Sequence, residues 1–210
     1  MKRLFKIVCA LFLGFSLCAC SSNEDESIRK VVSGYFDALH EGNLQKAQGF
    51  CDKSFDDETG LSETTDSLAR QLKELDLGDA FNSEANTFIQ TMIKSTVQEY
   101  EILNYKVDGD KATINVDVTG INTLTLDLTQ AQQDGVAELS TYINDNMDSL
   151  NEILNDKGEE AMKQKIVDEA SVILFGKMNE VIEKSPTQTK TVQVTLKKTD
   201  GKWLLTAANQ

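Results

Sequence analysis

The spacing of apolar residues changes along the chain between a period near 3.6 and a period of two, which separates helical regions from strands. Apolar side chains recur at steps of three and four over residues 27–41, which predicts an amphipathic helix. Gly42 is a natural C-terminal stop, and Asn43 suits the cap of a shorter helix through about Cys51. The polar stretch 52–60 is expected to be a loop.

Four further stretches show the helical period. One covers 61–77, one is expected to run from Ser83, as its cap, to about residue 98, and two form a helical hairpin within 128–185 that breaks at Gly158 and ends before Pro186. Each arm has about 25 residues, which is about 35–40 Å at 1.5 Å per residue. We expect the two apolar stripes to pack on each other or on a neighbouring sheet. The alternative is a groove for a partner.

The middle of the chain shows the strand period. Alternating residues predict a strand over 99–107, a hairpin turn at Asp108-Gly109, and a partner strand over 110–119. Gly120 interrupts the alternation and is interpreted as a bulge. The alternation resumes over 124–128, so we expect one long bent strand or two strands in series.

The C-terminus returns to the strand period. Residues 191–196 and 202–207 alternate and are joined by the turn sequence Asp200-Gly201. For this arrangement of helices and strands we expect the α+β class. We expect a single domain over 27–210 with a helical insertion at about 128–185.

The chain opens with a cationic and apolar leader. Its apolar run over 7–17 is too short to span a hydrocarbon core, which needs about 20 residues, and fits a secretory signal peptide over 1–19. The leader ends in Leu17-Cys18-Ala19-Cys20, which matches a bacterial lipobox, the site where a diacylglyceryl group is attached to the last cysteine. The alternative is an ordinary signal peptide cut beside Ala19, which would not need cysteine at the next position.

The lipobox predicts where the protein acts. A lipid on Cys20 would hold the mature protein at the cell membrane on its extracytoplasmic face, because two or three acyl chains give stable anchoring. Residues 21–26 are polar and acidic, so together with Cys20 they are expected to form a lipidated tether over 20–26.

The charge of the chain excludes some partners. Removing the leader takes away three cations and no acid, which lowers the formal net charge from −13 to −16. An acidic chain is repelled by nucleic acids and by anionic lipid head groups. We therefore expect no nucleic-acid partner and no membrane docking through a basic patch.

The residues that usually carry chemistry are scarce. Cys51 is the single thiol that remains after processing and lipidation, so no disulfide forms within the mature chain. His40 is the single histidine, which leaves no zinc site. The acids at 52–58 do not follow the spacing of a calcium loop and are interpreted as solvated. We expect no metal and no cofactor.

Two pieces of the chain resemble a known family. They are Tyr35-Phe36-Asp37-Ala38-Leu39 with Glu41-Gly42-Asn43, and the ending that runs from Val192 to Trp203. The pair resembles small lipoproteins of Gram-positive bacteria that carry a nuclear-transport-factor-2-like domain, many of them of unknown function. The resemblance implies a cone, in which a curved antiparallel sheet wraps around the N-terminal helix. A minimal cone lacks the helical region at 128–185, so this region would fill or cap the pocket.

We expect a non-catalytic binding role for a small ligand or an envelope protein. The ligand would lie in the cone or in the cleft between the cone and the helical hairpin, against apolar walls. The residues expected to line this pocket are Tyr35, Phe36, Phe50, Tyr100 and Trp203.

Two alternatives remain open at the level of sequence. One is an enzyme of the proton-transfer or hydrolytic kind on the same fold, whose sign would be an internal carboxylate facing Tyr35 in an open pocket. Asp37 and Asp117 are expected to point away from the interior, and no catalytic residue is assigned. The other is a structural or assembly protein that docks through its helical arms, whose sign would be a large exposed apolar patch.

Overall fold

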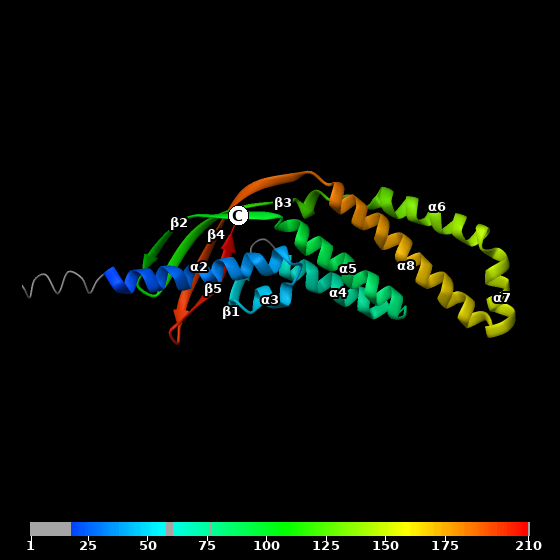
Figure 1. Cartoon of the computed structure of the whole chain (residues 1–210), viewed down its shortest axis with the longest axis horizontal. Helices are drawn as coiled ribbons and strands as arrows, with labels where there is room; N and C mark the ends of the chain where they lie inside the picture. The colour runs from blue at the N-terminus through cyan, green and yellow to red at the C-terminus, as the bar shows by residue number, and fades with distance from the viewer. Residues whose placement is uncertain (1–17, 58–60, 76, 210) are drawn as a thin grey trace, which may run out of the picture.

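The computed structural model describes residues 18–57, 61–75 and 77–209. A curved sheet and the first helix lie toward one end of the molecule, and a group of helices extends toward the other end (Figure 1). In chain order the elements are α2 (Cys18–His40), α3 (Leu44–Gln48), β1 (Cys51–Asp57), α4 (Leu61–Leu75), α5 (Asp79–Thr96), β2 (Glu99–Asp108), β3 (Lys111–Ile121), η1 (Thr123–Thr125), α6 (Thr129–Asp145), α7 (Met147–Lys157), α8 (Glu159–Lys184), β4 (Thr187–Thr199) and β5 (Lys202–Asn209).

The five strands form one sheet in the order β1-β5-β4-β3-β2. β2 and β3 form one antiparallel hairpin and β4 and β5 another, while β3 and β4 pair antiparallel although α6, α7 and α8 separate them in the chain. The sheet curves around α2 (Figure 1). This confirms the predicted class, α+β with a curved sheet on an N-terminal helix and a long helical insertion. The edge strand β1, which pairs parallel with β5, is an addition to the prediction.

The alternation along β3 sorts its side chains onto two faces of the sheet. Inward residues pack with the apolar stripe of α2 and with β4 and β5 in one core. On the outward face Asp117 accepts a hydrogen bond from Thr191 Oγ1 at 2.6 Å, and the hydroxyls of Thr119 and Thr189 lie 2.8 Å apart. The outward direction predicted for Asp117 is confirmed. The inward residues of β3 are Ala112, Ile114, Val116 and Val118.

The end of α2 agrees with the sequence. Gly42 has a φ of +75°, its N–H donates to Leu39 O at 2.9 Å, and the Asn43 N–H donates to Ala38 O at 2.8 Å. These two bonds satisfy carbonyls that the helix end leaves without partners. The Asn43 side chain then accepts the Lys46 N–H at 2.9 Å and caps α3, as predicted.

Helix α2 begins earlier than predicted, at Cys18 and not at Ser27, so residues 20–26 are helical. Two long-range contacts hold this part of the helix on the sheet. Glu24 forms an ion pair with Lys198, and Asp25 accepts a hydrogen bond from the hydroxyl of Tyr105. Partners so distant in sequence leave no local signal. Positions 1–17 of the predicted leader lie outside the described residues.

One segment that was predicted to be a loop is a strand, and one that was predicted to be a strand is not. Residues 51–57 form the edge strand β1, since their backbone finds a partner in β5 and the side chain of Phe55 packs on the core. The rest of that predicted loop, 58–60, lies outside the described residues. Conversely, residues 122–128 are not a strand. The pairing of β3 with β4 ends at Ile121 and Thr187, where β4 begins, and the chain turns through η1 into α6.

Two local predictions about glycine and serine are wrong. Gly120 is not a bulge, because it pairs in regular register with Gln188, and the irregularity lies instead between Ile102 and Asn104 on β2. Ser83 does not cap α5, because the helix begins four residues earlier, at Asp79. The Ser83 carbonyl oxygen accepts a hydrogen bond from the Thr87 hydroxyl at 3.0 Å inside the helix.

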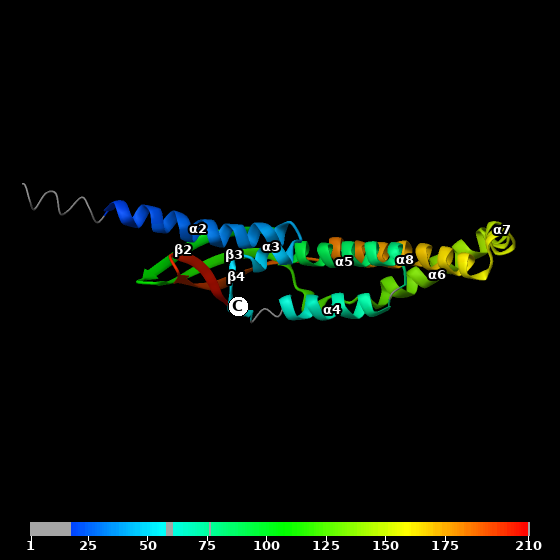
Figure 2. The same cartoon turned by 90° about the horizontal axis from the view of Figure 1, so that it is seen from below.

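The insertion forms a helical hairpin whose first arm is broken. α6 and α7 are separated at Asn146, and α8 returns between α6 and α5 (Figure 1). The ring of Phe175 on α8 lies 5.4 Å from that of Phe81 and 5.7 Å from that of Phe88, both on α5. Figure 2 shows α4 in a second layer beside α5 and α8. Among the described helices, none is both long and apolar enough to cross a bilayer.

Candidate functional site

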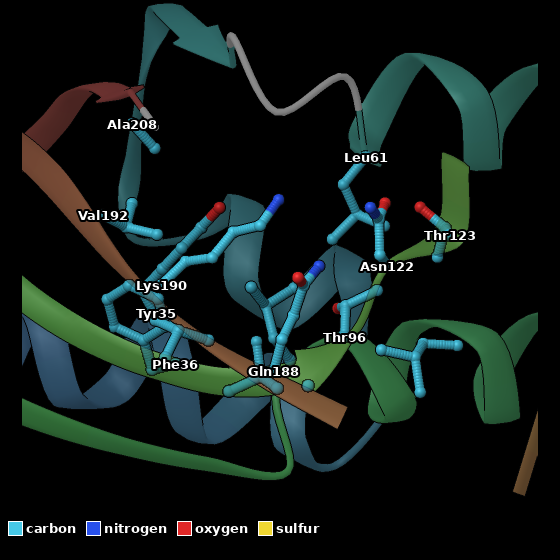
Figure 3. A pocket seen from close by; sticks show the side chains of 15 residues that line it. Tyr35, Phe36, Leu61, Thr96, Asn122, Thr123, Gln188, Lys190, Val192 and Ala208 are labelled. Atoms are coloured by element: carbon cyan, nitrogen blue, oxygen red, sulfur yellow. The ribbon is translucent and has the colours of Figure 1, made fainter. Parts of the chain in front are cut away.

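A cavity of about 170 Å³ lies where the curved sheet meets the helical extension (Figure 3). α2 contributes one wall. The ends of β3 and β5 and the start of β4 contribute another, and the start of α4 and the end of α5 close the rest. Its lining consists of Tyr35, Phe36, Leu39, Leu61, Thr96, Val97, Val118, Gly120, Ile121, Asn122, Thr123, Gln188, Lys190, Val192 and Ala208.

The lining combines an apolar floor with polar groups on one side. Phe36, Val118 and Val192 are buried and come from α2, β3 and β4. Figure 3 shows the Tyr35 hydroxyl and the ends of Lys190 and Gln188 directed to the same side of the cavity. Apolar walls with a few convergent polar groups are the usual composition of a small-molecule site.

Tyr35 is a buried polar residue of the cavity. Its side chain is buried, with its ring centroid 5.2 Å from that of Phe36 and 5.9 Å from that of Phe55. Burial raises the pKa of the Tyr35 hydroxyl, and the nearby charge of Asp57 and the thiol of Cys51 raise it further. Tyr35 therefore keeps its proton at neutral pH and can donate a hydrogen bond to a ligand.

The charge of Asp57 is the feature closest to the catalytic alternative. This carboxylate lies at the end of β1, near enough to raise the pKa of Tyr35 and of Cys51. One of its oxygens already accepts the Ser62 N–H at 2.9 Å, in the first turn of α4. The pKa of Cys51 rises to about 12, first through burial and then through Asp57, so this thiol is not a nucleophile at neutral pH.

The five residues predicted to line a pocket separate into three groups. Tyr35 and Phe36 line the cavity. Tyr100 lies behind Phe36, with the two rings stacked at 5.3 Å, and its hydroxyl donates to Asp37 Oδ1 at 2.7 Å. Phe50 packs on the backbone of α2, and Trp203 lies in the core below Lys198, so these two do not reach the cavity.

Five polar residues of the cavity were missed in the sequence, namely Thr96, Asn122, Thr123, Gln188 and Lys190. Gln188 and Lys190 share the phase of the inward-facing Val192, so the period of two could have placed them. Asn122 follows the end of β3, in a segment that was predicted to be strand, so no pattern pointed to it.

The remaining candidate groups serve the fold. His40 Nδ1 lies 3.0 Å from the Val97 carbonyl oxygen, which can only accept, so this nitrogen carries the proton. Asp52 accepts hydrogen bonds from the backbone and hydroxyl of Ser54. Across the part of the chain that the structure describes, no three histidines, cysteines or acids lie close enough together to hold a metal ion.

The solved structures that are similar to this chain include two distant neighbours. A substituted variant of a protein titled Rd1NTF2_05 is 11% identical, with a TM-score of 0.38, and covers 89% of this chain and 97% of its own. A substituted variant of Rv3472, described as a function unknown protein from Mycobacterium tuberculosis, is 10% identical, with a TM-score of 0.39, and covers 91% of this chain and 73% of its own. No family model and no curated protein matches the chain.

Proposed function

We propose that the protein is a lipid-anchored extracytoplasmic binding protein whose cone holds a small ligand. The observation that carries this proposal is the cavity itself, with the Tyr35 hydroxyl, Lys190 and Gln188 above an apolar floor. An apolar cavity of about 150 Å³ takes one benzene ring, so 170 Å³ suits a ligand of about one ring with one polar group.

The position of the predicted lipid anchor is compatible with a ligand in the cone. α2 begins at the end of the molecule that lies opposite the helical extension (Figure 1). A diacylglyceryl group on Cys20 would thus attach the protein by that end and leave the cavity and the extension exposed to the extracytoplasmic medium. The alternative of docking through the helical arms depends on exposed apolar residues. Examples are Val136, Met147 and Val172, which lie on three different helices.

The binding role is tested with ligand-observed NMR and a set of single-ring alcohols, amides and carboxylates. Gln188→Trp fills the cavity, whereas Gln193→Trp places the same ring on the outward face of the same strand. We expect fragments that bind the unsubstituted protein and the Gln193→Trp variant and that lose binding at least tenfold in Gln188→Trp. A set without a single binder, or equal binding to both variants, would refute the proposal.

The anchor is tested separately with Cys20→Ala. The unsubstituted protein should partition with membranes and carry the mass of a diacylglyceryl group on its N-terminal peptide. The variant should lack this mass and should not be cut at this position. A variant that still partitions with membranes and is cut at the same place contradicts lipidation.

The charge of Asp57 near Tyr35 favours a second candidate, a proton-transfer enzyme. Such an enzyme would exchange a carbon-bound proton of a bound fragment with solvent deuterium. The test is to follow that signal by NMR in deuterated buffer. Exchange that is lost in both Asp57→Asn and Tyr35→Phe would support catalysis, and binding without exchange would leave the binding role.

A further inference from the structure

A second and larger hollow lies within the helical extension, apart from the cone cavity. It has a volume of about 830 Å³ and lies between α4 on one side and α5 and α8 on the other, which are the two layers visible in Figure 2. We call it the helical groove. Its lining consists of Glu63, Thr64, Ser67, Leu68, Gln71, Leu72, Leu75, Leu77, Phe81, Phe88, Met92, Leu128, Gln132, Val167, Ala170, Ser171, Leu174, Phe175 and Met178.

The walls of the helical groove are almost free of charge. Glu63 is the single charged residue among the described residues that line it, and it is exposed. Phenylalanine rings and two methionines form the side built by α5 and α8, and methionine adapts readily to an apolar ligand. Without a cation on the walls, an anionic group would find no counter-charge inside, and the one carboxylate, Glu63, is exposed. The occupant must therefore be apolar where it is enclosed.

The helical groove is also long. Its wall on α4 runs from Glu63 to Leu75, about 18 Å at 1.5 Å per residue. Leu75 and Leu77, at one end of this wall, are 55% and 40% exposed. A narrow apolar space of this length, with exposed leucines at one end, suits a linear chain that enters from that end.

We propose that the helical groove holds the acyl chain of a diffusible lipid, with the lipid head group outside in water. The volume lies in the usual range for small-molecule sites, about 300–1,000 Å³. An extended peptide would need free backbone partners, and no strand contributes to the lining.

The protein's own anchor does not reach this position. Cys20 lies in the first turn of α2, and the helical groove lies beyond the opposite end of that helix (Figure 1). The lipid must therefore be a separate molecule, and its site shares no lining residue with the cone cavity.

The proposal is tested with cis-parinaric acid, a linear fatty acid whose fluorescence rises in apolar surroundings. The protein used is the chain 20–210 with Cys20→Ser, which keeps every described element except the first two residues of α2 and carries no anchor. We expect saturable binding that monopalmitoylglycerol, a neutral lipid, displaces. In a series of saturated fatty acids, affinity should rise about fourfold per added methylene until the groove is filled.

Two matched variants locate the site. Ala170→Phe introduces a ring into the helical groove, whereas Val172→Phe places the same ring on the same helix at a residue that is 51% exposed and does not line the groove. We expect Ala170→Phe to weaken cis-parinaric acid binding at least tenfold and Val172→Phe to leave it unchanged. Thermal unfolding of both variants shows whether the fold is kept, and Leu72→Trp, which fills the groove from α4, serves as a second blocking variant.

Three results would overturn the proposal. One is an unsubstituted protein that does not bind cis-parinaric acid. Another is binding that Ala170→Phe and Leu72→Trp leave intact while Gln188→Trp abolishes it, which would place the fatty acid in the cone. The third is a dimer in solution that dissociates in Ala170→Phe, which would make the helical groove an interface between copies.

Discussion

At the scale of single residues, Gly120 shows how tightly the sheet and the helical extension are joined. A Cβ atom added at this position would lie 2.1 Å from the carbonyl oxygen of Thr96, at the end of α5. Both are backbone positions, so no flexible side chain can move aside. The glycine thus permits β3 to pass directly under α5, and both residues line the cone cavity.

We therefore predict that Gly120→Ala destabilises the protein by about 1–3 kcal/mol or more, since the backbone must shift to accept the methyl group. The control is Gly176→Ala in the middle of α8, where an added Cβ meets nothing within 4 Å. This variant should gain about 0.5–1 kcal/mol, because alanine favours the helix. Urea unfolding of the three proteins measures both changes. Equal stability of Gly120→Ala and the unsubstituted protein would contradict the contact.

The same scale shows what the sequence could and could not predict about the site. Tyr35 and Phe36 were placed inward from the stripe of α2, because the helical period fixes which side chains share a face. Phe50 and Trp203 are also aromatic, but they pack in or against the core away from the cavity. Aromatic character alone therefore predicts burial and not membership of one cavity, which depends on how distant elements meet.

At the scale of elements, the long amphipathic helices and the two hairpins were predictable from local patterns. β1 and the start of α2 were not, because each depends on partners far along the chain. Residues 51–57 become a strand through β5, and Glu24 and Asp25 are held by Lys198 and Tyr105. A local pattern contains no information about such pairings, and polar composition then favours loop or tether.

The docked start of α2 predicts resistance to proteolysis. Endoproteinase Glu-C should cut the native protein slowly after Glu24 and Glu26, because a helix must open locally before it is cleaved. Lys198→Met removes the ion pair and should raise the cleavage rate about two- to fivefold, as expected for an exposed pair. Lys197→Met is the matched control. Rapid cleavage of the unsubstituted protein at both sites would show that the segment is a tether after all.

At the scale of the whole molecule, buried residues are distributed unevenly. The sheet, α2 and α5 contribute most of the main core, while α6 has two buried residues and α7 has only Leu150. Stability within a protein follows local burial, so elements with few buried side chains open at lower cost than the rest. The tip of the helical extension should therefore open independently of the cone.

Amide hydrogen exchange followed by mass spectrometry checks this difference. α7 should exchange well before β3 and β4, which lie in the interior of the sheet. Leu150→Ala removes the one buried side chain of α7, a change that costs about 2–5 kcal/mol in a packed site. If the tip opens on its own, Leu150→Ala can lower the free energy of unfolding of the sheet by no more than the free energy that opening the tip costs in the unsubstituted protein. We therefore expect α7 to lose its protection while β3 stays protected.

Met147→Ala, on the same helix at a residue that is 46% exposed, should change neither region. Loss of protection in β3 together with α7 would instead show that the cone and the extension unfold as one unit. In that case a lipid in the helical groove would stabilise the cone as well, since a ligand that binds only the folded state stabilises everything that unfolds with its site. The exchange pattern thus decides whether the two proposed binding sites are energetically linked.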